Sequence, residues 1–184
     1  MKTKITLSGE VASGKTTVGK LLAKKLNYDF ISLGTIVRER AEKEGLHILE
    51  FQEKCQQNPE MDLEIDRYFA NFCNAKDSLV IDYRMGFKFV TDAHHVFLKI
   101  SEQDAVNRLK TANRINESYK TVGQRNESFK SQFQTSYRLD YTAENHYDLI
   151  VSIDGKQTAE EITDTIINHI ITKNNEKQNY SAEQ

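Results

Sequence analysis

The sequence lacks the features that mark several classes of protein. Its only two cysteines, Cys55 and Cys73, are spaced neither as zinc ligands nor as a disulfide framework, and we expect both to lie on apolar helix faces. No apolar run approaches the roughly 20 residues that a membrane helix needs. The chain begins on a strand pattern rather than on a signal peptide. We therefore expect a cytoplasmic protein with no membrane partner.

A strong excess of charge of either sign is also missing. The formal net charge is −2, so the field of the whole molecule gives no pull toward nucleic acid or anionic membrane. A highly anionic ligand must then be held by a local site. The hydrophobic fraction of 38% and the charged fraction of 28% indicate a globular chain. Its 184 residues suffice for one compact α/β domain.

Short apolar runs alternate with helical patterns along the chain. Several of the runs are uniformly apolar, which predicts a parallel sheet covered by helices on both faces. Helices are expected on both sides of Pro59, after a cap at Ser101 and after a capping box at Thr158. We expect a single domain over residues 1–172 and a polar, disordered tail over residues 173–184. The expected strands cover residues 4–7, 28–32, 78–82, 95–100 and 149–153.

The most specific motif is a phosphate-binding loop. Residues 9–16 fit the pattern G-x-x-x-x-G-K-[ST] and lie between an expected strand and an expected helix. Glycines let several backbone N–H groups point at one anion, and the helix adds its positive end. Lys15 would place a charge between the β- and γ-phosphates of a nucleotide, and the Thr16 hydroxyl would ligate the Mg²⁺ that arrives with ATP. The predicted nucleotide-binding residues are Gly9, Glu10, Val11, Ala12, Ser13, Gly14, Lys15, Thr16 and Thr17.

Two acidic residues near this loop have more than one reading. Asp82 stands at the carboxyl end of the third expected strand, where ligands of open α/β sheets gather. Its carboxylate either orients a water on Mg²⁺ or merely ends the strand in a turn, and we favour the metal role together with Thr16. Glu10 lies inside the loop, and we favour a solvated side chain that points away from the phosphates.

The chain contains no N-K-x-D motif, which a guanine-reading switch GTPase would need. Arginines instead follow the expected strands: Arg38 follows the second and Arg84 the third, and Arg108, Arg114 and Arg125 come later. Phosphoryl transfer depends on positioning and on positive charge over the transferring group, and guanidinium forks suit both tasks. For each arginine a surface ion pair is the alternative. We favour function for Arg38 and Arg84 and leave the other three open.

Together these motifs resemble the short, archaeal-type branch of the cytidylate kinases, within the nucleoside monophosphate kinases. The resemblance runs from Lys4 to about His169. Its strongest parts are the phosphate loop and residues 31–38, which read I-S-L-G-T-I-V-R and are similar to the family's S-x-G-x-I-x-R acceptor-binding stretch. Weaker parts are the acceptor-domain helices, the E-G-R-like turn and the last strand, seen at residues 49–51, 59–67, 80–84 and 147–151.

The resemblance implies a fold and a reaction. The fold is a three-layer P-loop kinase fold with a five-stranded parallel sheet in the order 2-3-1-4-5. A helical acceptor-binding insert would cover about residues 34–76, and an arginine-bearing lid about residues 111–123. The reaction is transfer of the γ-phosphate of ATP, with Mg²⁺, to a monophosphate, with CMP or dCMP as the first guess. The implied protein is a monomer or a weak homodimer.

The resemblance also implies roles for five residues besides Lys15. Ser32, Arg38 and Arg84 would hold the phosphate of the acceptor. Arg114 and Arg125 would reach over the transferring phosphoryl group, and with Lys15 they are the predicted catalytic residues.

One segment departs from the family pattern. After the lid the family resembles R-[DE]-x-x-[DE]-x-x-R, whereas residues 125–132 read R-N-E-S-F-K-S-Q. Phe129 replaces the second acid and Gln132 the final arginine, so neither can make the family's contact with the monophosphate. Either the register differs, with Lys130 or Arg138 substituting, or the acceptor is not CMP. The alternatives are a P-loop kinase of a nucleoside, sugar or cofactor precursor, and a nucleotide-binding module without transferase activity.

Overall fold

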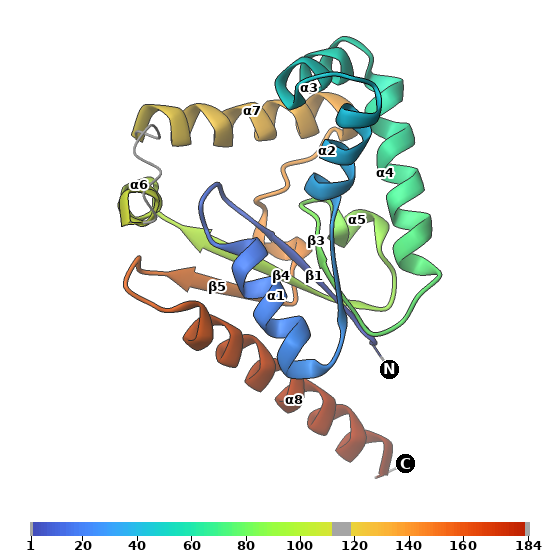
Figure 1. The fold of residues 1–184 in the computed structure, drawn as a ribbon. Helices are drawn as coiled ribbons and strands as arrows, with labels where there is room; N and C mark the ends of the chain where they lie inside the picture. Colours follow the sequence, from blue (N-terminus) through green and yellow to red (C-terminus); the bar gives the residue numbers. More distant parts are fainter. Residues whose placement is uncertain (1, 112–118, 183–184) are drawn as a thin grey trace.

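The computed structural model describes residues 2–111 and 119–182, which form a parallel sheet with helices on both faces (Figure 1). The order of the strands is β2-β3-β1-β4-β5, as the resemblance implied, and every neighbouring pair is parallel. The fold class is therefore confirmed. The five strands are β1 (Lys4–Gly9), β2 (Asp29–Ser32), β3 (Leu79–Asp82), β4 (Ala93–Ile100) and β5 (Leu149–Ile153).

The helices divide between the two faces of the sheet. Helices α1 and α8 lie against each other on one face, while α4 and α5 lie on the other, and α7 extends toward α2 and α3 (Figure 1). Their bounds are α1 (Lys15–Leu26), α2 (Leu33–Lys43), α3 (Ile48–Gln57), α4 (Pro59–Asn74), α5 (Gly86–Phe89), α6 (Glu102–Thr111), α7 (Tyr119–Tyr137) and α8 (Ala159–Ala182), with a short 3₁₀ turn at Glu144–His146.

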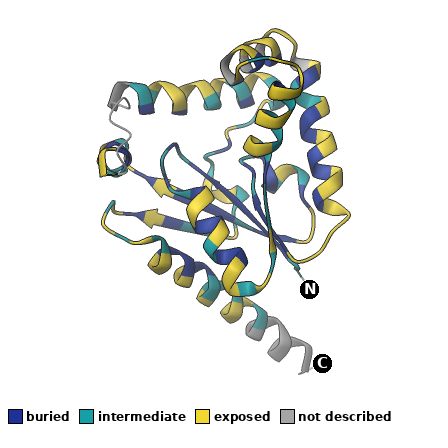
Figure 2. Cartoon of the chain, in the orientation of Figure 1, coloured by how far each residue is buried: buried dark blue, intermediate teal, exposed yellow. Residues whose placement is uncertain are grey.

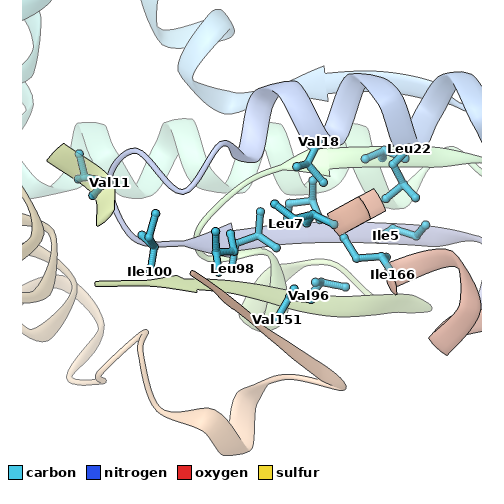
Figure 3. Packing of buried hydrophobic residues seen from close by; sticks show 14 of the residues in the cluster. Ile5, Leu7, Val11, Val18, Leu22, Val96, Leu98, Ile100, Val151 and Ile166 are labelled. Atoms are coloured by element: carbon cyan, nitrogen blue, oxygen red, sulfur yellow. The ribbon is translucent and has the colours of Figure 1, made fainter. Parts of the chain in front are cut away.

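The core explains why the uniformly apolar runs became central strands. Ile5 and Leu7 of β1 are buried against Val18 and Leu22 of α1 and Ile166 of α8 (Figure 3). Burying one such side chain contributes about 1.5–3 kcal/mol. The helices show buried residues toward the sheet and exposed residues outward (Figure 2). This packing fixes the strands in register and sets their carboxyl ends along one edge.

Local signals in the sequence placed several helix ends correctly. The Ser101 hydroxyl accepts the Asp104 N–H at 3.1 Å at the start of α6. At the start of α8 the Glu161 carboxylate accepts the Thr158 N–H at 2.7 Å, and the Thr158 hydroxyl accepts the Glu161 N–H at 3.2 Å. This reciprocal pair is the capping box that the spacing predicted. Pro59 opens α4, where its missing N–H leaves no bond unmade.

Other boundaries differ from those expected. Helix α2 begins at Leu33, directly after β2, and so includes Gly34. Helix α7 begins at Tyr119, inside the segment expected to be a lid, and residues 112–118 lie outside the described residues. Helix α8 continues to Ala182, past the point where we expected order to end. Once packing anchors the first turns of a helix, each further residue gains one hydrogen bond, so the helix can extend beyond its packed part.

Two further expectations can be compared with this fold. Cys55 and Cys73 are free and buried, as predicted for small apolar residues on helices. Within residues 2–111 and 119–182 no helix has the length and apolar character needed to cross a bilayer.

Candidate functional site

The phosphate loop joins the end of β1 to α1, and its backbone needs glycine at two positions. Gly9 has a φ of 146°, and a Cβ there would come within 2.5 Å of the Leu98 carbonyl oxygen of β4. Gly14, with a φ of 85°, stands just before Lys15 at the N-terminus of α1. These conformations are open to glycine but strained for other residues. The loop therefore curves tightly around the helix end, as an anion cradle requires.

Lys15 is folded into this loop. Its Nζ donates to the Gly9 and Glu10 carbonyl oxygens at 3.0 and 2.9 Å, and it reaches the Ser13 hydroxyl at 3.5 Å. Only 8% of the residue is exposed. Burial, followed by the charge of Arg84, lowers the pKa of Lys15 well below its ordinary value of 10.5. The ammonium group is thus held among the loop carbonyls. The negative charges of Asp82 and Glu10 raise its pKa, but burial and the charge of Arg84 lower it more.

The two residues predicted to serve a metal lie together. The Thr16 hydroxyl donates to Asp82 Oδ2 at 2.7 Å. They meet because β1 and β3 are neighbours with Leu7 in register with Asp82, so both strands end at the same edge. A hydroxyl and a carboxylate are hard oxygen ligands of the kind that Mg²⁺ prefers. Among the described residues no group of three or more His, Cys, Asp or Glu is placed to hold a metal.

Side chains tie the loop down on two sides. Glu10 is partly buried rather than fully solvated: its Oε2 accepts the Ile100 N–H at the end of β4 at 2.6 Å. The contact points the carboxylate toward the edge of the sheet, where it accepts the N–H at the end of a strand. On the other side Asn126 Oδ1 of α7 accepts the Val11 N–H at 2.9 Å. The curved loop is thereby fixed between β4 and α7.

Two arginines join Lys15 in this region. Arg84 follows β3, and the positive charges of Arg84 and Arg125 both contribute to the lowered pKa of Lys15. The Arg84 guanidinium carbon lies 3.9 Å from the centre of the Phe129 ring. Burial lowers the pKa of Arg84, with the charge of Arg125 acting in the same direction. Three cations therefore gather beside the cradle, with Asp82 as the nearby acid.

The predicted acceptor residues lie along the same sheet edge. Ser32 ends β2 directly beside Asp82, and it is buried. Arg38 lies one turn into α2, is exposed, and donates to the Thr35 hydroxyl at 3.3 Å. Arg114 falls outside the described residues. The structure thus brings Ser32, Asp82 and Arg84 to one edge and leaves Arg38 at its exposed border.

The departure at Gln132 has a structural explanation. Gln132 Nε2 donates to Asp62 Oδ2 of α4 at 2.6 Å. One turn along α4, the buried Asp66 accepts hydrogen bonds from both the Tyr83 and the Tyr137 hydroxyls. Burial raises the pKa of Asp66, and the two tyrosine hydroxyls oppose that rise. Gln132 therefore joins α7 to α4 in place of any contact with a phosphate.

Sequence reasoning missed or left open two residues of this site. Arg108 of α6 donates to the Gln157 carbonyl oxygen, and its Nη1 would lie 3.4 Å from a Cβ placed on Gly14. Asn126 of α7 was not singled out at all. No local pattern marks either residue, because both reach the phosphate loop from helices about a hundred positions along the chain. The only available signal was their spacing from the loop in a known fold.

Comparisons with known proteins agree with this geometry. Residues 4–155 match the family described as cytidylate kinase-like. The chain is 31% identical over 176 residues to a cytidylate kinase of Sulfurisphaera tokodaii, with 92% of this chain and 98% of that protein covered. The shikimate kinase of Acinetobacter baumannii in complex with shikimate has a TM-score of 0.64 at 19% identity, covering 92% of this chain and 93% of that one. This last likeness shows a shared P-loop kinase fold.

Another relative carries a different name. Over 172 residues the chain is 49% identical to an S-adenosylmethionine-dependent nucleotide dehydratase of Lacinutrix mariniflava. The match covers 92% of this chain but 36% of the dehydratase, so the chain spans about a third of that protein's length. The remainder of the dehydratase has no counterpart in the 184 residues.

Proposed function

The chain belongs to the cytidylate kinase-like family, and from this premise we propose that it transfers the γ-phosphate of ATP to a nucleoside monophosphate, with CMP or dCMP as the first candidate. One observation carries the proposal: Lys15, Arg84 and Arg125 gather beside the phosphate loop, where Thr16 and Asp82 would supply oxygen ligands to a metal. Phosphoryl transfer needs this combination of positive charge and positioning.

The donor would lie across the N-terminus of α1. Its β- and γ-phosphates would accept hydrogen bonds from the loop N–H groups and from the Lys15 ammonium. Lys15 would then exchange its loop carbonyl partners for phosphate oxygens. The base would lie on the α6 side, where the flat guanidinium of Arg108 is close to Gly14 and suits stacking on an aromatic ring.

Thr16 and Asp82 would hold the Mg²⁺ that accompanies ATP, directly or through water. When bound, the ion supplies charge neutralisation at the β- and γ-phosphate oxygens. The 2.7 Å hydrogen bond between the two side chains supports this assignment, because it holds both oxygens close enough to serve one ion.

The chemical step is an in-line displacement. An oxygen of the acceptor phosphate forms a bond to the γ-phosphorus, the bond from that phosphorus to the β–γ bridging oxygen breaks, and ADP leaves. An ionised acceptor phosphate is itself the nucleophile, so the protein need not supply a general base. Arg84 and Arg125 would stabilise the charge that spreads over the transferring group, and Ser32 and Arg38 would orient the acceptor.

Two side chains near the proposed acceptor site bear on the identity of the acceptor. Phe129 faces the Arg84 guanidinium and Gln132 is bound to Asp62. The acid and the arginine of the family pattern are therefore replaced by a neutral ring and a helix–helix contact. These changes leave phosphate binding at Arg84 intact and alter the surface that meets the rest of the acceptor.

A direct assay tests the proposal. Purified protein is incubated with ATP, Mg²⁺ and each common nucleoside monophosphate in turn, and diphosphate products are separated by ion-exchange chromatography. We expect turnover on at least one acceptor, with a cytidine nucleotide first. A parallel panel of nucleosides, sugars and cofactor precursors, read by ADP release, distinguishes a kinase of another acceptor. If neither panel yields a product, the proposed phosphotransferase activity is rejected.

A second candidate follows from the 49% identity to part of a dehydratase. In this alternative the chain binds a nucleotide and presents it to a dehydratase, without transferring phosphate itself. Calorimetric titration with ATP, CMP and CTP in the presence of Mg²⁺ separates the two. Tight binding with no acceptor-stimulated ADP release favours the presenting role, whereas acceptor-dependent ADP release by this chain alone excludes it.

A further inference from the structure

The buried side chain of Asn126 hydrogen-bonds helix α7 to the phosphate loop. Its Oδ1 accepts the Val11 N–H at 2.9 Å across 115 positions of sequence, and the residue is 7% exposed. Val11 is also buried. A buried N–H without an acceptor is strongly disfavoured, so this bond constrains both partners.

The same bond fixes the position of two neighbouring residues of α7, Arg125 and Phe129. Arg125 is the preceding residue, and its charge contributes to the lowered pKa of both Lys15 and Arg84. Phe129, one turn further along the same helix face, packs on the Arg84 guanidinium. A rotation or shift of α7 that broke the Asn126 bond would therefore move Arg125 and Phe129 together, away from the loop.

We propose that Asn126 is a positioning residue that couples the phosphate loop to α7 and so aligns Arg125 with the transferring phosphate. The proposal rests on the proposed function. Asn126 stands at the first acid of the pattern R-[DE]-x-x-[DE]-x-x-R. An amide oxygen accepts the same N–H as a carboxylate but brings no negative charge close to the bound phosphates. Because coupling is reciprocal, a nucleotide in the loop stabilises α7 through this bond.

The first experiment needs no acceptor and no turnover. Amide exchange of Val11 is followed by NMR in nucleotide-free wild type, Asn126→Leu, Asn126→Asp and the control Gln124→Leu. Gln124 is exposed and is the other helical neighbour close to Arg125. We expect exchange at Val11 to accelerate about tenfold or more in Asn126→Leu, since a bonded amide becomes unbonded. Wild-type exchange is expected in the control and in Asn126→Asp, which keeps an acceptor oxygen. Val11 protection that is equal in Asn126→Leu and wild type overturns the proposal.

The second experiment tests whether the residue acts through Arg125. With an accepted monophosphate, Asn126→Leu should lower kcat about tenfold, which is the effect of roughly one lost hydrogen bond, with little change in the KM of the acceptor. Asn126→Asp should restore most of the rate. The double variant with Arg125→Ala should be no slower than Arg125→Ala alone. Losses that simply multiply would show a general structural role and overturn the assignment.

The outcomes separate the two proposals. A wild type that phosphorylates no acceptor refutes the proposed function, yet the Val11 exchange still decides the tie between Asn126 and the loop. If Asn126→Leu fails to fold, as circular dichroism would show, Asn126→Asp and Asn126→Ser carry the same comparison. Serine offers a shorter acceptor and is expected to protect Val11 less than asparagine does.

Discussion

Replacing Lys15 by methionine should abolish phosphoryl transfer and leave the stability of the nucleotide-free protein almost unchanged. Two opposing effects lead to the second expectation. Burial disfavours the ammonium form, as the lowered pKa of Lys15 shows, so methionine removes an unfavourable charge. The variant also loses the two bonds to the Gly9 and Glu10 carbonyl oxygens, each of which contributes about 1 kcal/mol. We expect the free energy of unfolding to change by less than about 2 kcal/mol.

With bound nucleotide, wild type should become clearly more stable than the variant. ATP at about 100 times its Kd stabilises a protein that binds it by about 2.7 kcal/mol. For a domain of this size that corresponds to a rise in Tm of roughly 5–10 °C. The variant should lose most of this rise, and its transfer rate should fall by at least about 10²–10³-fold, as for removal of one preorganised charge-stabilising group.

Thermal unfolding with and without ATP and Mg²⁺, together with ADP release in the presence of an acceptor, measures both effects. Lys20→Met is the matched control, because Lys20 is exposed on the same helix. The sign of the pH dependence adds a check. Since the pKa of Lys15 is lower when folded, the unfolded chain binds more protons as pH rises from the folded pKa toward 10.5, and nucleotide-free wild type gains stability over that window. Lys15→Met should lack that gain. A variant with wild-type transfer and the full ATP-induced shift would refute the reasoning.

Three further substitutions test other parts of the structure. Asp82→Asn removes the carboxylate beside Thr16 and should raise the Mg²⁺ concentration for half-maximal rate about tenfold; an unchanged Mg²⁺ titration would contradict this. Arg84→Gln removes the guanidinium that packs on Phe129 and should raise the KM of the acceptor about tenfold; initial-rate kinetics measure this, and an unaltered KM speaks against a phosphate at Arg84. Burial lowers the pKa of His95 from 6.5 to about 4, so the unfolded chain takes up the proton first. Wild type should therefore lose up to about 2 kcal/mol between pH 7 and pH 5, a loss that His95→Gln should lack in urea unfolding.

Much of the fold and the centre of the site were predictable because they depend on local pattern. The loop glycines, Lys15 and Thr16 are specified by adjacent residues and by a strand-to-helix junction. Asp82 could be brought to Thr16 from sequence because the carboxyl ends of parallel strands share an edge. Ser32 was named by the family resemblance, and the structure places it beside Asp82. The inference for Asp82 needed only the type and direction of its strand.

The remainder depends on how α7 is rotated, which no local pattern reveals. The helix carries polar residues on most of its surface, so its periodicity does not show that Asn126 faces the loop or that Gln132 faces Asp62. Gln132 was read as a lost phosphate ligand because its partner, 70 positions away, was not visible. Glu10 was read as solvated for the same reason, since its partner is a strand-end amide of β4. Side chains whose partners are distant in sequence are thus the ones that sequence reasoning misassigns.

The arrangement of charge explains how a weakly acidic chain can hold a polyphosphate. Lys15, Arg84 and Arg125 repel one another, although burial is the larger cause of the lowered pKa of Lys15 and of Arg84. The loop carbonyls hold Lys15 in place, and the Phe129 ring packs on Arg84. An anion placed among them relieves that repulsion and raises the pKa of Lys15 again. Binding must then draw in a proton wherever the pH is close to the lowered pKa, because the liganded form favours the ammonium more than the free form does. We therefore expect relief of this repulsion to contribute to the affinity for phosphate.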